Sequence, residues 1–231
     1  MDIRLQQTLD QVADLVYHCE RGNNLDRAEA LLREATQEQQ SPHTLARLHA
    51  ELAQVEFWRY EYAPESRRLA IAESGVRLAK SALTYDSNSL EANAWAAALM
   101  GIHGLEMGIL SSLFYIGQVK ACAERALELN EAYQNAMPHQ ILGDLYRLTP
   151  PSPVGFRDKH RALGHLQRAR ELAPTCPQAK LRLAELYIGM RKHDLARSEL
   201  QAVLEQEIEE HGPLYAGRCQ ARARNLLAKL P

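Results

Sequence analysis

Histidine and cysteine are the residue types in this sequence that could hold a metal ion. The chain has 231 residues, including nine histidines and four cysteines. The nearest candidate pairs are His160 with His165, and His18 beside Cys19. Two ligands on one face of a helix must lie three or four residues apart, and these pairs lie five and one apart. We therefore predict solvated or core histidines, with no metal and no cofactor.

Motifs for phosphate binding or nucleophilic catalysis are scarce. The sequence lacks Gly-x-x-x-x-Gly-Lys-Ser/Thr, Gly-x-Ser-x-Gly and His-Glu-x-x-His. Gly101, Gly104 and Gly108 follow no strand pattern and lack the dinucleotide spacing, so they favour close helix packing. We expect a protein that is not an enzyme.

The composition is typical of an all-helical protein. Leucine, alanine, glutamate, glutamine and arginine dominate, aromatic residues make up 6%, and long runs pass without glycine or proline. The formal net charge is −2, with acidic and basic residues interspersed along the chain. This balance disfavours nucleic acid as the main partner.

Cysteine usage and the first residues bear on the compartment. Cys19, Cys122, Cys176 and Cys219 lie far apart, which favours a reduced, cytoplasmic location. The opening "MDIRLQQTLDQ" shows no secretory signal, and we expect a periplasmic location only if an export signal was removed. The apolar segment 100–117 contains His103 and Glu106, so it predicts a buried helix pair rather than a membrane span.

A spacing of small and large residues repeats along the chain. Near the C-terminus, Tyr187 is followed by Ala196, Leu200 and Val203, and earlier Tyr146 is followed by a similar run from Ala162. This pattern resembles the tetratricopeptide repeat (TPR), in which a large–small pair on one helix receives a small residue from the next. The equivalent third positions are separated by 47, 44, 43 and 34 residues, and only the last equals the standard period. They are Ala35, Ala82, Ala126, Ala169 and Val203.

The repeat predicts an all-α, TPR-like α-solenoid of antiparallel helix pairs, in one domain over residues 1–231. Three hairpins have gained seven or eight residues between their two helices, and we expect these enlarged connections to lie together in one lobe. The approximate units are 3–40, 43–88, 90–131, 136–174 and 177–208, followed by a capping helix at 214–230.

The third enlarged connection contains a block of prolines. Consecutive prolines must end the preceding helix near Thr149, and Asp158 is placed to cap the next helix. Over Leu142–Pro174 the sequence resembles the T component of TRAP-type transport systems, with a Pro-Pro-x-Pro-x-Gly-Phe-x-Asp-Lys arm between two helices. The resemblance implies a helical-repeat protein, usually exported, that associates as trimers beside a solute-binding protein. It leaves homo-oligomerisation open.

Two sets of side chains are candidates for binding. The first lies where the concave face of a TPR solenoid binds peptides, although its i, i+3 pairs Glu56–Arg59 and Asp144–Arg147 could instead neutralise each other. The second would line a pocket in the insertion lobe. The groove set is Glu56, Arg59, Met100, His103, Asp144, Arg147 and Glu185, and the pocket set is Leu110, Phe114, Tyr115, Pro151 and Phe156.

Two functions follow from these sets. The leading prediction is a scaffold that binds a protein or peptide segment on its concave face or insertion lobe. The alternative is a transport accessory or carrier, similar to the T component, that holds a small apolar ligand in a cavity lined by the insertions. An enclosed cavity would favour the carrier, and an open groove would favour the scaffold.

Overall fold

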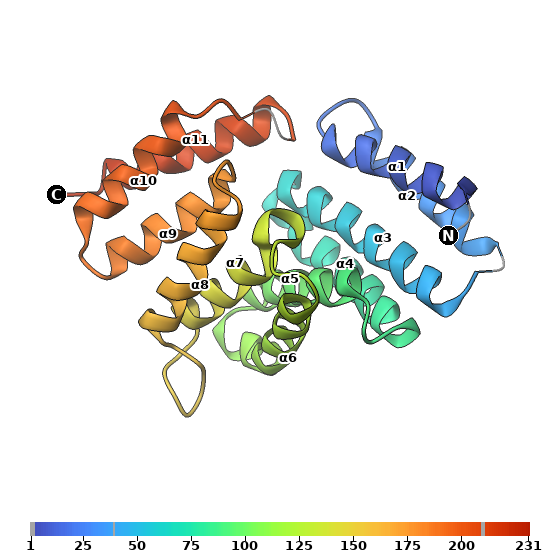
Figure 1. Ribbon diagram of the computed structural model, residues 1–231, viewed down its shortest axis with the longest axis horizontal. Helices are drawn as coiled ribbons and strands as arrows, with labels where there is room; N and C mark the ends of the chain where they lie inside the picture. The colour runs from blue at the N-terminus through green and yellow to red at the C-terminus, as the bar shows by residue number, and fades with distance from the viewer. Residues whose placement is uncertain (1–2, 39, 209–210) are drawn as a thin grey trace. The chain divides into compact units, whose positions relative to one another are not determined.

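The computed structural model describes residues 3–38, 40–208 and 211–231, with the side chains of 109–112 outside the description. These ranges form eleven helices and contain no strand (Figure 1), which confirms the predicted all-α, TPR-like fold class. The helices are α1 (Ile3–Tyr17), α2 (Asn24–Gln37), α3 (Pro42–Tyr62), α4 (Glu65–Tyr85), α5 (Leu90–Glu106), α6 (Ile109–Leu129), α7 (Tyr133–Leu148), α8 (Lys159–Leu172), α9 (Pro177–Gly189), α10 (His193–Glu205) and α11 (Pro213–Leu227).

The chain divides into two compact units, Met1–Ala126 and Leu127–Pro231. We call them the N-terminal and C-terminal units and describe each by itself. The predicted single domain over 1–231 stays a prediction.

In the N-terminal unit, successive helices pack as antiparallel pairs. α1 packs on α2, α3 on α4, and α5 on both α3 and α4. Serine side chains define two helix starts: Ser41 accepts a hydrogen bond from the Thr44 amide at 3.1 Å, and Ser89 accepts one from the Ala92 amide at 3.3 Å. α5 is buried on nearly all sides, with Trp95 3% exposed and Leu99 fully buried.

In the C-terminal unit, α7 packs on α8, α8 on α9, α9 on α10 and α10 on α11. The helices α7, α9 and α11 also contact one another in sequence, as the first helices of stacked repeats do. Asp158 caps α8 as predicted, since its carboxylate accepts from the amides of His160 and Arg161 at 2.9 and 3.1 Å. α7 starts irregularly: residues 134–136 have positive φ, and Pro138 follows in the first regular turn, where its missing N–H costs no helical hydrogen bond.

The three hairpins are enlarged in two different ways. In the first two, the added residues lengthen the helices: α3 and α4 have 21 residues each and are joined only by Ala63 and Pro64, and α5 and α6 are joined by Met107 and Gly108. In the third, α7 ends at Leu148, as the prolines predict, and a long loop leads to α8. Figure 1 shows this loop projecting away from the helices. Because the three hairpins belong to different units, the predicted common lobe stays a prediction.

Candidate protein-binding site

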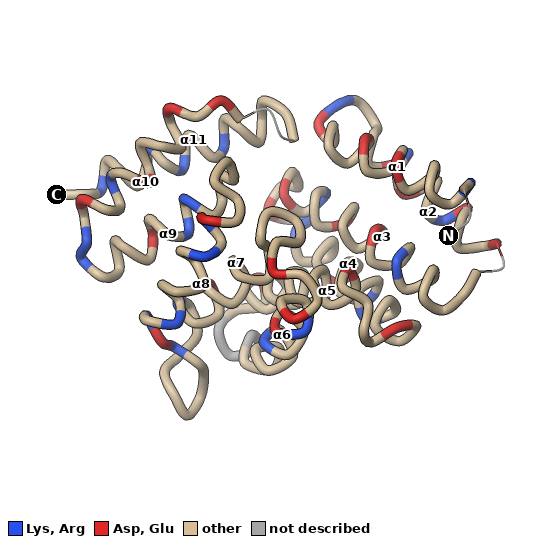
Figure 2. Tube along the Cα trace, viewed as in Figure 1, with Lys and Arg blue, Asp and Glu red and all other residues tan. Residues whose placement is uncertain are grey.

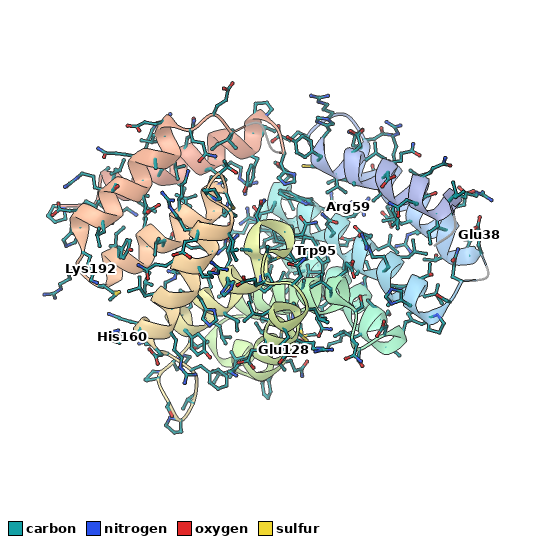
Figure 3. The ribbon with its side chains drawn as sticks, viewed as in Figure 1. Glu38, Arg59, Trp95, Glu128, His160 and Lys192 are labelled. Atoms are coloured by element: carbon teal, nitrogen blue, oxygen red, sulfur yellow. The ribbon has the colours of Figure 1, made fainter. Side chains whose placement is uncertain are left out.

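In the N-terminal unit, the predicted groove residues Glu56 and Arg59 belong to a cluster of carboxylates around one arginine. The Arg59 guanidinium lies 2.6 Å from Asp26, 2.5 Å from Glu29 and 3.3 Å from Glu56. Arg59 lies on α3 and is labelled in Figure 3. Burial raises the pKa of the Glu56 carboxyl above its usual range, and Arg59 opposes this rise. Both terminal nitrogens of Arg59 are therefore committed to carboxylates of the chain itself.

A second arginine of α3 is committed in the same way. Arg47 lies 2.7 Å from Glu51 and 2.5 Å from Glu91 on α5. Glu51 is buried, and this burial raises the pKa of its carboxyl. The first helices of the helix pairs in this unit thus carry more acidic than basic residues. Their arginines neutralise carboxylates of the chain itself.

Met100 and His103, the other groove candidates of this unit, lie among buried side chains. Met100 is 2% exposed and His103 is 6% exposed. The His103 ring meets the Tyr115 ring edge-on at 5.4 Å between centroids, and its Nε2 lies 3.9 Å from a Glu73 oxygen. The structure places both side chains in contact with the chain's own helices rather than on an open surface.

In the C-terminal unit, the predicted residues Asp144, Arg147 and Glu185 lie together in a ladder of charges across α7, α9 and α11. Asp144 lies between Arg147, at 2.7 Å, and Arg182, at 2.6 Å. Glu185 lies between Arg147, at 3.1 Å, and Arg222, at 2.5 Å. We call these five residues the arginine face. It carries three guanidinium groups and two carboxylates.

The guanidinium groups of the arginine face keep donors available. Arg182 donates from Nε to Asp144 and from Nη1 to Gln140, which leaves Nη2 without a partner in the described ranges. Nη1 of Arg147 and Nη1 of Arg222 likewise have no partner among the described residues. The three side chains are 18%, 29% and 43% exposed for Arg147, Arg182 and Arg222, so solvent reaches all of them.

The electrostatics of Asp144 show how firmly the arginine face is held. Burial alone would raise the pKa of this carboxyl, but the charges of Arg182 and Arg147 outweigh burial and hold the pKa below its usual value. The same pairing raises the pKa of Arg182, although its partial burial opposes this rise. Asp144 is therefore ionised and fixes two guanidinium planes on neighbouring helices.

The predicted insertion-pocket residues fall in both units. The side chain of Leu110 lies outside the described residues. Phe114 is 82% exposed, and Tyr115 packs against His103. Pro151 and Phe156 lie on the exposed loop between α7 and α8.

One pocket of the described structure measures about 110 Å³ and lies between α1 and α2, and none of the predicted pocket residues lines it. Sites for drug-sized ligands measure roughly 300–1,000 Å³. This pocket therefore gives the predicted carrier function no support. Its lining residues are Arg4, Leu5, Thr8, Leu31, Glu34, Ala35 and Glu38.

A histidine pair was missed by the sequence argument. His139 on α7 and His165 on α8 bring their Nδ1 atoms to 2.9 Å, and the other nitrogen of His139 lies 3.1 Å from Glu131. Arg168 holds Glu131 at 2.5 Å. Spacing along one helix could not reveal a pair separated by 26 residues. Across the residues that the structure describes, no cluster of three or more metal-ligating side chains occurs.

The packing of successive helix pairs defines the class of this protein, a TPR helical-repeat protein. A family model described as tetratricopeptide repeat matches residues 158–230. The crystal structure of a thermophilic TPR protein of Thermus thermophilus matches with a TM-score of 0.68 and 20% identity, covering 97% of this chain and 99% of that one. At this identity the likeness shows the fold. TPR-like folds generally mediate protein–protein interactions, and TPR-repeat proteins are typically non-enzymatic scaffolds.

A more particular family matches the first part of the chain. The model described as regulator of microtubule dynamics protein 1-3 covers residues 9–146, which is more than half of the sequence. The chain belongs to this family. A comparison with curated proteins gave no match.

Two further predictions concerned a membrane span and the resemblance to a transport component. Among the described residues, no helix is both long and apolar enough to cross a membrane. The resemblance of Leu142–Pro174 to the T component of TRAP-type systems stays a prediction.

Proposed function

We propose that this protein is a non-enzymatic scaffold whose arginine face binds an acidic segment of a protein partner. The observation that carries the proposal is one terminal nitrogen on each of Arg147, Arg182 and Arg222 that has no partner in the part of the chain that the structure describes. These three arginines lie on three successive first helices, so an extended peptide could cross all three.

Charge complementarity supports an acidic rather than a basic segment. Three guanidinium groups against two carboxylates leave the arginine face with a surplus positive charge. Guanidinium groups bind carboxylates with charge-assisted hydrogen bonds, often through two donors at once. The internal carboxylates hold the guanidinium planes in place, which lowers the entropy cost of binding.

A fluorescently labelled glutamate-rich peptide tests the binding chemistry. We expect it to bind the full chain, and we expect a lysine-rich peptide of equal length not to bind. Arg182→Gln and Arg222→Gln should each weaken binding at least about tenfold, because one charge-assisted hydrogen bond contributes about 1.5 kcal/mol or more. Arg224→Gln is the matched control, since Arg224 is exposed on α11 but points away from Arg222. Equal loss in the control, or no loss in the other two variants, would contradict the proposal.

The family description suggests the first macromolecular partner to test. Because the family is described as regulator of microtubule dynamics, co-sedimentation with microtubules is the natural first assay. We expect the full chain to pellet with microtubules at low salt and the double variant Arg182→Gln/Arg222→Gln to remain in the supernatant. Co-sedimentation that is unchanged in the double variant would separate any microtubule association from the arginine face.

A further inference from the structure

The loop between α7 and α8, residues 149–158, is a largely exposed connection of the C-terminal unit, and we call it the proline arm. Its tip consists of Pro151, Ser152, Pro153 and Val154, all exposed, with Val154 56% exposed. Phe156 follows and is 36% exposed. No charged residue occurs from 149 to 156, and Figure 2 shows this segment free of Lys, Arg, Asp and Glu.

The proline arm is ordered by its own hydrogen bonds. The amides of Gly155 and Arg157 donate to the carbonyls of Pro151 and Pro150 at 3.2 and 3.1 Å, and the Phe156 amide donates to Thr149 Oγ1 at 3.1 Å. A Cβ at Gly155 would lie 2.4 Å from the Pro150 carbonyl oxygen, so this close turn requires glycine. The arm therefore presents its apolar tip in one conformation and offers few free amides to a partner.

Basic side chains lie next to the base of the proline arm, in the sequence that follows it and on the turn between α9 and α10. Lys159 donates to the Gly189 carbonyl at 2.8 Å, which brings the α9–α10 turn beside the start of α8. Residues 149–161 and 189–194 together carry five basic and two acidic side chains, a formal net charge of +3 in a chain of net charge −2. We call this set the basic edge; its cationic members, all exposed, are Arg157, Lys159, Arg161, Arg191 and Lys192.

We propose that the proline arm and the basic edge dock on the surface of an anionic lipid bilayer. An apolar tip with cationic side chains near its base matches a layer of anionic headgroups over an apolar interior. A protein partner fits less well, because prolines lack amide donors and the amides of Gly155, Phe156 and Arg157 are bonded within the arm. This contact uses none of the residues of the arginine face and does not depend on the proposed function.

Vesicle flotation tests the proposal with the full chain. Vesicles of phosphatidylcholine mixed with phosphatidylserine should carry the protein at low salt, and vesicles of phosphatidylcholine alone should not. Raised salt should release it, because exposed charges are screened. In Figure 3 the labelled Lys192 projects outward from the C-terminal unit. Lys192→Glu should weaken binding about tenfold, since it reverses one charge near the headgroups.

Val154→Asp tests the apolar tip separately and should also weaken binding about tenfold, because it places a carboxylate in the headgroup layer. Leu214→Asp is the control: Leu214 is 62% exposed on α11, outside the basic edge. Circular dichroism should show that all variants keep their helical content. Equal binding to neutral vesicles, no binding to mixed vesicles, or unchanged binding of both Lys192→Glu and Val154→Asp would overturn the proposal.

Discussion

The two units use arginine on their first helices in opposite ways. In the N-terminal unit, Arg47 and Arg59 are each shared among carboxylates, two of which are buried. In the C-terminal unit, the three arginines of the arginine face outnumber its two carboxylates, and each has a terminal nitrogen without a partner among the described residues. The difference teaches that equivalent positions of a repeat fold can serve either internal neutralisation or a partner, according to the ratio of acid to base around them.

The largest expected effect tests whether the first helices of the N-terminal unit serve the core. Trp95 is 3% exposed on α5, and removing its ring in Trp95→Ala should cost about 3–5 kcal/mol of unfolding free energy. Urea denaturation followed by circular dichroism measures this cost. An unchanged midpoint would contradict both the burial of Trp95 and the repeat register that predicted it.

The next largest effect is the difference in unfolding free energy between two variants, one in each unit, that each remove the charge of a carboxylate. Asp144→Asn should cost about 2 kcal/mol, because two guanidinium groups lose their shared anion. Glu56→Gln should cost less than about 0.5 kcal/mol, because Arg59 keeps Asp26 and Glu29 as partners. The same denaturation experiment measures both variants. Equal costs would remove the contrast between the units.

The pKa values of the same two carboxyl groups should also be shifted in opposite directions, upward for Glu56 and downward for Asp144. Glu56, and the neighbouring buried Glu51, should take up a proton above the ordinary pKa of 4.5, so the folded state gains relative stability as pH falls through that raised pKa. Asp144 should protonate below its ordinary 3.8. Its contribution to stability is present above pH 3.8 and is lost as pH falls through the lowered pKa.

Carboxyl carbon NMR titration measures these values directly. Glu131 provides a reference, because hydrogen bonds from Arg168 and His139 lower its pKa to about 2. A titration in which Glu56 takes up its proton at a lower pH than Asp144 would contradict the environments that we assign to these two carboxyl groups.

Much of the local structure follows from residue types. Consecutive prolines placed the end of α7, and the short carboxylate of Asp158 placed the start of α8, because helix termini depend on backbone donors a few residues away. Alanines at repeat positions, such as Ala162, Ala169 and Ala196, are fully buried, as close helix packing requires.

The form of the enlarged hairpins was harder to predict. A count of residues between the repeat positions of the two helices cannot distinguish longer helices from a longer loop. Only the proline block resolves this, since proline excludes a continuous helix.

Only part of the arginine face could be predicted from the sequence. The pair Asp144–Arg147 follows from i, i+3 spacing, but Arg182 and Arg222 lie on other helices. Asp144 and Arg182 are 38 residues apart, and Glu185 and Arg222 are 37 apart. These separations are close to one repeat, because stacking brings equivalent positions of successive repeats together. A search for opposite charges one repeat apart could have found them.

The most direct test of the account observes the arginine side chains themselves by NMR while a glutamate-rich peptide is added. We predict that the guanidinium resonances of Arg147, Arg182 and Arg222 shift, and that those of Arg47 and Arg59 stay in place. Shifts at Arg47 or Arg59 without shifts at Arg182 and Arg222 would contradict the assignment of the binding surface to the C-terminal unit.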